Sequence, residues 1–266
     1  MKHWYALGLL ACVACSPGTF GDEDVAVFTS PSGCIHNVIQ RIPGGWLLRE
    51  PEVHFDFWGD YWTNQVPDGG LPEEQQYWVD WTDILTRGTV LQRLDEYGIH
   101  GGSLEIVVHN NDTSANIGPD TDIDEAGLPE LSDSVFPAQL NLEISLDLLP
   151  YPNDNSLYVV MLPPGVTTQH LVNDNAAAYH NWASYGSQRY AYAVIGYQGA
   201  NQADDAVLSH EIYEAATDPD VKTGFIDWTT GDEIADLCED HRGQSNVVIG
   251  GVTVQKVWSQ AACTCE

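Results

Sequence analysis

Three ionisable side chains in the run LSHEIYEAATDP have the types and the spacing of a metal-binding group. If this run is helical, His210 and Glu214 stand one turn apart on the same face, because side chains at i and i+4 are neighbours on a helix. An imidazole and a carboxylate placed in this way can bind one metal ion together. Glu211 points from an adjacent sector, where its carboxylate could take a proton from a water molecule on that ion. The run therefore predicts a metal site that carries its own general base.

A third protein ligand must come from outside this helix, and two places in the sequence could supply it. The first is the later run GDEIADLC, which we expect to form a second helix. Its Glu233 would complete the site, and Asp236 would be either a further ligand or the acceptor that orients His210 through its free ring nitrogen. The second place is the end of the first helix, where Asp218 and Asp220 compete for the same position.

The pattern H-E-x-x-E resembles the H-E-x-x-H motif of the zincin metallopeptidases, and a ligand Glu on a later helix resembles the gluzincin arrangement. The resemblance implies a zincin-like peptidase that acts through a metal-activated water. Because Glu214 replaces the second His of the motif, the site is harder than a two-His site, so calcium or manganese stand as alternatives to the expected zinc ion. The competing interpretation is a solvated acidic helix face that ends at Asp218-Pro219 and binds no metal.

A larger part of the chain resembles the EXORDIUM, or phosphate-induced, protein family of plants and its bacterial relatives. The resemblance is most specific in H-E-x-x-E-x-x-T-D-P and E-I-A-D-L-C, and it includes the segments VHFDFWGDYW, LYVVMLPPGV and AYH. It favours His180, just before an expected strand, as a residue that approaches the metal or the substrate, although a His beside aromatic rings is commonly a packed residue. The plant members are cell-wall proteins linked to growth signalling, and the resemblance implies no catalytic activity. It therefore implies a second function class, a non-catalytic cell-surface or matrix protein with a structural metal ion.

The composition narrows the range of partners. Lys and Arg total 9 against 39 Asp and Glu in 266 residues, so the formal net charge is −30. Nucleic acid and anionic membrane surfaces would repel such a chain, whereas cations would be attracted to it. We expect an extracellular peptide or glycan as the substrate or ligand. Six rings could stack on sugar faces, although burial in the core explains most of them more simply: Trp58, Tyr61, Trp62, Tyr77, Trp78 and Trp81.

The N-terminus predicts export. Lys2 is followed by a short apolar stretch, too short to span a bilayer as a mature helix. Its end, LLAC, is similar to a bacterial lipobox, in which Cys12 would carry the lipid anchor, and a plain signal peptide cut near Ala14 is the alternative. The protein is therefore expected to be secreted or to be a lipoprotein of the cell envelope.

Four cysteines remain beyond the signal, namely Cys34, Cys238, Cys263 and Cys265. In an oxidising compartment an even number of cysteines predicts disulfides, and four cysteines allow three pairings. We favour a bond from Cys238 to Cys263 or Cys265, which would tie the C-terminal tail beside the metal site.

The pattern of apolar runs predicts how these residues are positioned. We expect a signal peptide at 1–15, a tether and entry segment at 16–51, and one folded domain at 52–266. Within this domain the sequence predicts strands at 53–57, 104–109, 157–162 and 190–197, helices at 72–86, 90–97 and 135–149, and a hairpin within 246–257. This order predicts a mixed α/β (α+β) fold, a single zincin-like layered domain around one mixed sheet.

Overall fold

The computed structural model describes residues 39–62, 73–87, 89–105, 122–123, 129–174, 176–196, 202–239 and 245–266. The expected signal peptide, with the proposed lipid-anchor residue Cys12, and Cys34 lie outside these residues. Within the part of the chain that is described, no helix has both the length and the apolar character needed to cross a membrane.

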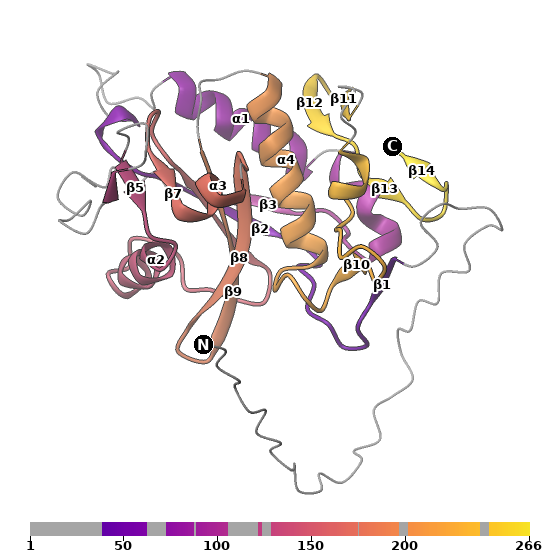
Figure 1. Ribbon diagram of the computed structural model, residues 1–266, viewed down its shortest axis with the longest axis horizontal. Helices are drawn as coiled ribbons and strands as arrows, with labels where there is room; N and C mark the ends of the chain where they lie inside the picture. The colour runs from indigo at the N-terminus through magenta and orange to yellow at the C-terminus, as the bar shows by residue number, and fades with distance from the viewer. Residues whose placement is uncertain are drawn as a thin grey trace, which may run out of the picture.

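A five-stranded mixed sheet forms the centre of the domain (Figure 1). Four strands are parallel, and the fifth, β8, runs antiparallel along one edge and pairs with β9 over its full length. In spatial order the strands are β3 (Ser103–Glu105), β2 (Glu52–Phe57), β6 (Ser156–Met161), β9 (Gln188–Ile195) and β8 (Ala178–Tyr185). The prediction of a mixed α/β fold around one mixed sheet is confirmed.

Helices cover both faces of the sheet, so its central strands are buried at nearly every position. Along β6, Leu157 and Val159 face a core that includes α1 (Glu73–Arg87) and α4 (Gln202–Thr217). The residues between them, such as Tyr158, face a second core built on α2 (Val135–Ser145) and α3 (Gln169–Asp174). In Figure 1, α2 lies on the opposite side of the sheet from α4. The sheet thus supports α4 along its buried face.

The remaining elements are short. The described residues include three 3-10 helices, at Asp60–Trp62 (η1), Leu91–Tyr97 (η2) and Asp236–Cys238 (η3). Small sheets pair β1 (Ile39–Arg41) with β10 (Phe225–Asp227), β11 (Asn246–Ile249) with β12 (Val252–Gln255), and β13 (Trp258–Ser259) with β14 (Thr264–Cys265); a further sheet joins β4 (Asp122–Ile123), β5 (Pro129–Leu131) and β7 (Thr167–Thr168).

Most expected elements are present with shifted ends. The helix expected at 90–97 is a 3-10 helix, and Gly98 ends it with a left-handed φ of 83°. The helix expected to reach residue 149 ends at Ser145, since the chain turns at Asp147 with a φ of 56°. The expected hairpin forms between β11 and β12, and its turn residues Gly250 and Gly251 adopt the positive φ that a tight hairpin requires.

The second helix expected around Glu233 is not formed. Glu233 makes an isolated β-bridge with Ile226, and only the last residues of the run form the short helix η3. Backbone groups of the run bond to residues far away in the sequence. The Ile234 carbonyl, for example, accepts a hydrogen bond from the Trp258 N–H at 2.8 Å. One helix-like bond remains, from the Leu237 N–H to the Glu233 carbonyl at 3.2 Å, and the tertiary bonds take the place of a longer helix.

The entry segment is packed into the domain over its described part, from residue 39 onward. Ile39 in β1 pairs with Asp227 in β10, and Trp46 and Leu48 are buried in the core that contains α4. The Leu48 N–H donates to the carbonyl of Ala216, in the last turn of α4, at 3.0 Å. This segment therefore supports the end of the helix that carries the candidate ligands.

Candidate metal centre

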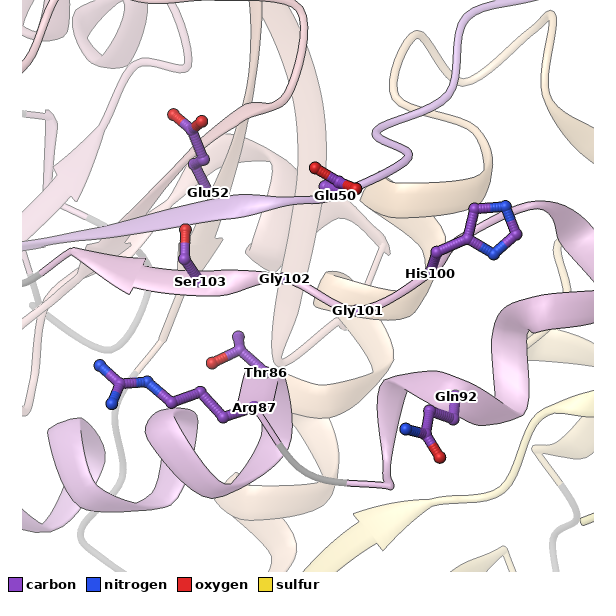
Figure 2. A pocket seen from close by; sticks show the side chains of 9 residues that line it. All are labelled: Glu50, Glu52, Thr86, Arg87, Gln92, His100, Gly101, Gly102 and Ser103. Carbon is purple, nitrogen blue, oxygen red and sulfur yellow. The ribbon is translucent and has the colours of Figure 1, made fainter.

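Two pockets on the described surface differ in their chemistry. One, of 490 Å³, lies between the end of α1, η2 and β3, and Figure 2 shows that the side chains of Glu52, Arg87 and His100 point away from one another there. The other, of 380 Å³, is lined on its apolar side by residues 176–178 and Val207. Its polar lining consists of His210, Glu211, Asp236, Glu239 and Gln255. The second pocket therefore contains residues expected to bind metal.

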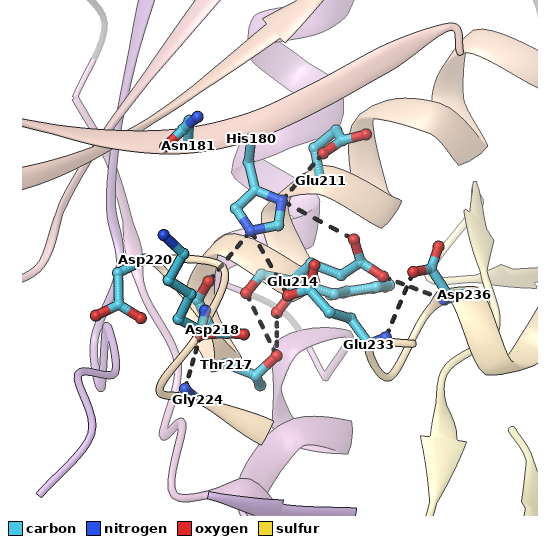
Figure 3. Close-up of polar contacts among 12 residues, drawn as sticks. His180, Asn181, Glu211, Glu214, Thr217, Asp218, Asp220, Gly224, Glu233 and Asp236 are labelled. Carbon is cyan, nitrogen blue, oxygen red and sulfur yellow. Dashed lines mark hydrogen bonds and ion pairs between the residues drawn. The ribbon is translucent and has the colours of Figure 1, made fainter. Parts of the chain in front are cut away.

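Helix α4 presents three of the expected residues on one side. Its other side, with Leu208 and Ile212 spaced by one turn, is buried against the sheet. Glu211 and Glu214 project away from that core, toward β8 and the turn at 233–236 (Figure 3). His210 lies on the same side, since its Nε2 contacts Glu214 and Asp236. The helical spacing predicted from the sequence is confirmed.

The first ligand group, here called the pocket-side group, consists of His210, Glu214 and Asp236. His210 Nε2 lies 3.0 Å from Glu214 Oε2 and 3.4 Å from Asp236 Oδ1. The side chain of His210 is 12% exposed and that of Asp236 is 40% exposed, so this group is open to the pocket.

Gln255, which the sequence did not single out, fixes the tautomer of His210. Its amide nitrogen donates to the Ala235 carbonyl at 2.9 Å, so its amide oxygen faces His210 Nδ1 at 3.1 Å. An amide oxygen accepts hydrogen bonds, so Nδ1 must carry the proton. The lone pair of a neutral His210 imidazole then points from Nε2 at two carboxylates, an arrangement that needs a proton or a metal cation between them. Without a metal, the proton fills this place: burial lowers the pKa of His210, but Glu214, Glu211 and Asp236 raise it well above its ordinary value.

The second ligand group, here called the buried group, consists of His180, Glu214 and Glu233. His180 Nδ1 lies 3.9 Å from Glu214 Oε2, and His180 Nε2 lies 3.6 Å from Glu233 Oε1. Nδ1 also contacts Glu211 Oε2 at 3.3 Å, and Nε2 contacts the carbonyl oxygen of Asp218 at 3.2 Å (Figure 3). The sequence placed His180 just before a strand, but it lies within the edge strand β8, with its side chain 4% exposed.

Burial and the neighbouring charges shift the pKa values of the buried group strongly. Burial lowers the pKa of His180, but Glu233, Glu211 and Glu214 together raise it to about 10. Burial, followed by the repulsion from Glu214, raises the pKa of Glu233 to about 9. Glu233 Oε1 is buried and has no hydrogen-bond partner. A buried carboxylate oxygen without a donor is costly, and a cation would satisfy it.

Glu214 belongs to both groups. Its Oε1 accepts the backbone N–H of Asp236 at 3.1 Å, whereas its Oε2 faces both imidazoles. Burial alone would raise the pKa of Glu214, but His210 and His180 lower it below its ordinary value. Glu214 is therefore the ionised centre of the cluster.

The two acids that competed for the third-ligand position shape the loop after α4. Asp218 Oδ1 accepts three backbone N–H groups, from Lys222, Thr223 and Gly224, at 3.0, 3.1 and 2.7 Å. Asp220 accepts the N–H and the hydroxyl of Thr223. Neither carboxylate belongs to a ligand group. Asp218 instead contacts the cluster through its carbonyl oxygen, which faces His180 Nε2.

The structure thus distributes the expected ligands over two groups. His210 and Glu214 meet as expected, and Asp236 joins them. Glu233 meets Glu214 together with His180, which was expected to approach the metal or the substrate but was not named among its ligands. Within each group the ligand atoms lie within 4.8 Å of one another. Two ligands with bonds of about 2.0–2.2 Å to one zinc ion lie at most about 4.4 Å apart, so small side-chain movements are sufficient. The buried group of His180, Glu214 and Glu233 could hold a metal ion.

A disulfide bond lies close to Asp236 in the sequence. Cys238 in η3 is bonded to Cys265 in β14, one of the two pairings favoured from the sequence. The bond joins residues that are 27 positions apart, and it attaches the C-terminal tail to Cys238, two residues beyond Asp236. It restrains the turn that supplies Asp236.

In comparisons with known proteins, no family model, no curated protein and no solved structure matches this chain.

Proposed function

We propose that the protein is an exported, metal-dependent hydrolase, a zincin-like peptidase that acts on extracellular peptides. The observation that carries the proposal is the tautomer of His210. Gln255 holds its Nε2 lone pair toward the carboxylates of Glu214 and Asp236, at a pocket large enough for a peptide side chain. A general base, Glu211, lines the same pocket.

The donor set supports zinc as the ion. An imidazole nitrogen with two carboxylates suits zinc and also manganese, whereas calcium prefers a shell made of oxygens alone. A divalent ion in this place would polarise a substrate carbonyl and lower the pKa of its bound water from about 15.7 to about 7.

The residues of the chain have separate tasks. His210, Glu214 and Asp236 hold the ion, and Gln255 keeps His210 in the tautomer that can bind it. Glu211 receives the proton of the attacking water at its carboxylate. His180 Nδ1, 3.3 Å from Glu211 Oε2, holds this carboxylate in place beside the pocket.

The test replaces the base and keeps the ligands. We expect Glu211→Gln to retain the metal, measured by elemental analysis, and to lose about 10²–10⁴-fold of the hydrolysis of a peptide library, the usual size of a general-base contribution. The matched control is Glu239→Gln, since Glu239 lines the same pocket but belongs to neither ligand group. A fully metallated wild-type protein that cleaves no peptide in the library would contradict the proposal.

The second candidate is a non-catalytic cell-surface or matrix protein with a structural metal ion. The burial of His180, Glu214 and Glu233 favours it, because a shell closed to solvent suits a structural ion. The resemblance to the EXORDIUM family also favours it. Its glycan-binding surface has less support, since Trp58, Trp62, Trp78 and Trp81 are all buried, and among the proposed stacking rings Tyr77 is the exposed one, at 38%. A metallated but inert protein would point to this function.

A further inference from the structure

We propose that the centre binds two divalent cations, one in each ligand group, with the carboxylate of Glu214 bridging them. The inference rests on the metal site of the proposed function and concerns how many cations that site holds. It starts from the fact that the pocket-side group and the buried group share one member.

The geometry of Glu214 fits a bridge. Its Oε1 is held by the N–H of Asp236, which leaves Oε2 to face His210 Nε2 at 3.0 Å and His180 Nδ1 at 3.9 Å. The two imidazoles belong to different groups, and each approaches Oε2 with a nitrogen atom. One oxygen that faces two separate nitrogen donors can serve two cations at once.

The other carboxylates divide in the same way. Asp236 lies beside His210 Nε2, the nitrogen that also faces Glu214. Glu233 lies beside His180 Nε2 and Glu214 beside His180 Nδ1, and one nitrogen of His180 has a ligand oxygen of each carboxylate within 4.8 Å. A single cation in either group leaves the carboxylate of the other group without a metal. Each cation has instead its own imidazole, its own carboxylate and a share of Glu214.

The charge of the cluster also indicates two cations. Glu211, Glu214, Glu233 and Asp236 together carry four negative charges when they are ionised, and the ligand imidazoles are neutral when a metal is bound. Two divalent cations balance these four charges, whereas one leaves two negative charges uncompensated. The side chains of Glu211, Glu214 and Glu233 are at most 10% exposed, and uncompensated charge is expensive at such burial.

An orphaned atom gives independent support for the second cation. Glu233 Oε1 is buried, has no hydrogen-bond partner, and points into the cluster toward His180 Nε2 (Figure 3). A cation on the pocket side alone would leave this oxygen unsatisfied. The buried cation would satisfy it, and the two ions would lie about 3.5–4 Å apart, as in other two-metal sites.

The two positions differ in access to solvent. The pocket-side group includes Asp236, whose side chain is 40% exposed, whereas every member of the buried group is buried. We therefore expect a chelator to remove the pocket-side cation first and the buried cation more slowly.

The experiment uses the full chain, stripped with a chelator and refilled with manganese(II) chloride as the probe. Bound manganese is counted by elemental analysis, and the electron paramagnetic resonance spectrum shows whether the ions are magnetically coupled. We expect two manganese ions per chain with a coupled spectrum. We expect one ion with an uncoupled six-line spectrum in Glu233→Gln and in Asp236→Asn, and two coupled ions in the control Glu239→Gln.

The outcomes separate this inference from the proposed function. One manganese ion per wild-type chain overturns the two-cation centre and leaves the single-metal hydrolase standing. No bound manganese overturns both. Two ions without magnetic coupling overturn the bridge. Circular dichroism confirms the fold of each variant, and the ion count of the wild-type chain decides the question if a variant does not fold.

Discussion

Replacing Glu233 by glutamine should have opposite effects on the metal-free and the metal-loaded protein. In the metal-free protein, the buried Glu233 must remain protonated in the folded state, since burial and the neighbouring Glu214 raise its pKa from 4.5 to about 9. In the unfolded chain it ionises at its ordinary pKa. Between these two pKa values the folded state therefore binds one more proton than the unfolded state, and stability falls as the pH rises. Glutamine cannot ionise, so the variant escapes this loss.

The size of the effect follows from the width of the pH window. From pH 4.5, the ordinary pKa of Glu233, to pH 6.5, where His180 begins to contribute its own pH dependence, the window is two units wide. Glu233 is already half ionised in the unfolded chain at pH 4.5, so the slope of about 1.4 kcal/mol per unit is reached only above that pH, and the free energy of unfolding of Glu233→Gln should gain about 2.3 kcal/mol on that of the wild type across this window. The side chain is 10% exposed, so solvent screening reduces the figure little.

Urea denaturation in the presence of a chelator, repeated at steps between pH 4.5 and pH 6.5, measures this difference directly. The same series with saturating metal should reverse the order of the two proteins, because the variant has lost a ligand and the wild type gains binding free energy. Glu239→Gln, at an exposed position, should follow the wild type in both series. Stability curves of Glu233→Gln and wild type that run parallel with pH under chelation would refute the burial argument for Glu233.

Three further changes test other parts of the structure. Burial and the adjacent Glu143 raise the pKa of Asp56 well above its ordinary 3.8, so the protein loses stability as the pH rises above that value. In Asp56→Asn the urea midpoint should therefore vary less with pH. A pH dependence equal to that of the wild type would contradict this. Replacing both Cys238 and Cys265 by serine removes a link across 27 residues and should cost about 3.5 kcal/mol of unfolding free energy, with a loss under about 1 kcal/mol counting against the chain-entropy account. Leu208→Ala, on the buried face of α4, should cost about 2–5 kcal/mol without changing the metal content, and a metal loss in the folded variant would show that the two faces are coupled.

The sequence predicted those elements whose pattern is local. β6 and most of β9 are apolar runs because helices cover both faces of the sheet, and such runs are easily found. β2 was found by its alternation of apolar and polar residues, although its polar residues His54 and Asp56 are buried as well. β8 was missed because it is an edge strand, buried only over its first residues and exposed or half-exposed beyond them. The run around Glu233 looked helical by its own spacing, but its backbone bonds go to Asp227 and Trp258, which no local pattern indicates.

In the candidate site, too, only the contacts between residues close in sequence could be predicted. His210 and Glu214 could be paired from the sequence because one helical turn separates them. The partner of Glu233 could not, because His180 reaches it only through the pairing of β8 with β9. The role of Gln255 depends on a hairpin packed against α4, and a lone glutamine in a strand carries no signal of that contact.

The strand that leads the described chain has a consequence for the order in which the protein folds. Gln40 and Trp228 are bonded across 188 residues, and Trp46 meets the Thr223 hydroxyl, in the loop that follows α4, across 177. Closing such long loops costs conformational entropy before the contacts contribute any stability, and this slows folding. Residues 40 and 46 cannot make these contacts until residues 223 and 228 have been synthesised. We therefore expect the ligand cluster to be assembled late, and a fragment that starts at residue 52 to lack the support that holds its helix end in position.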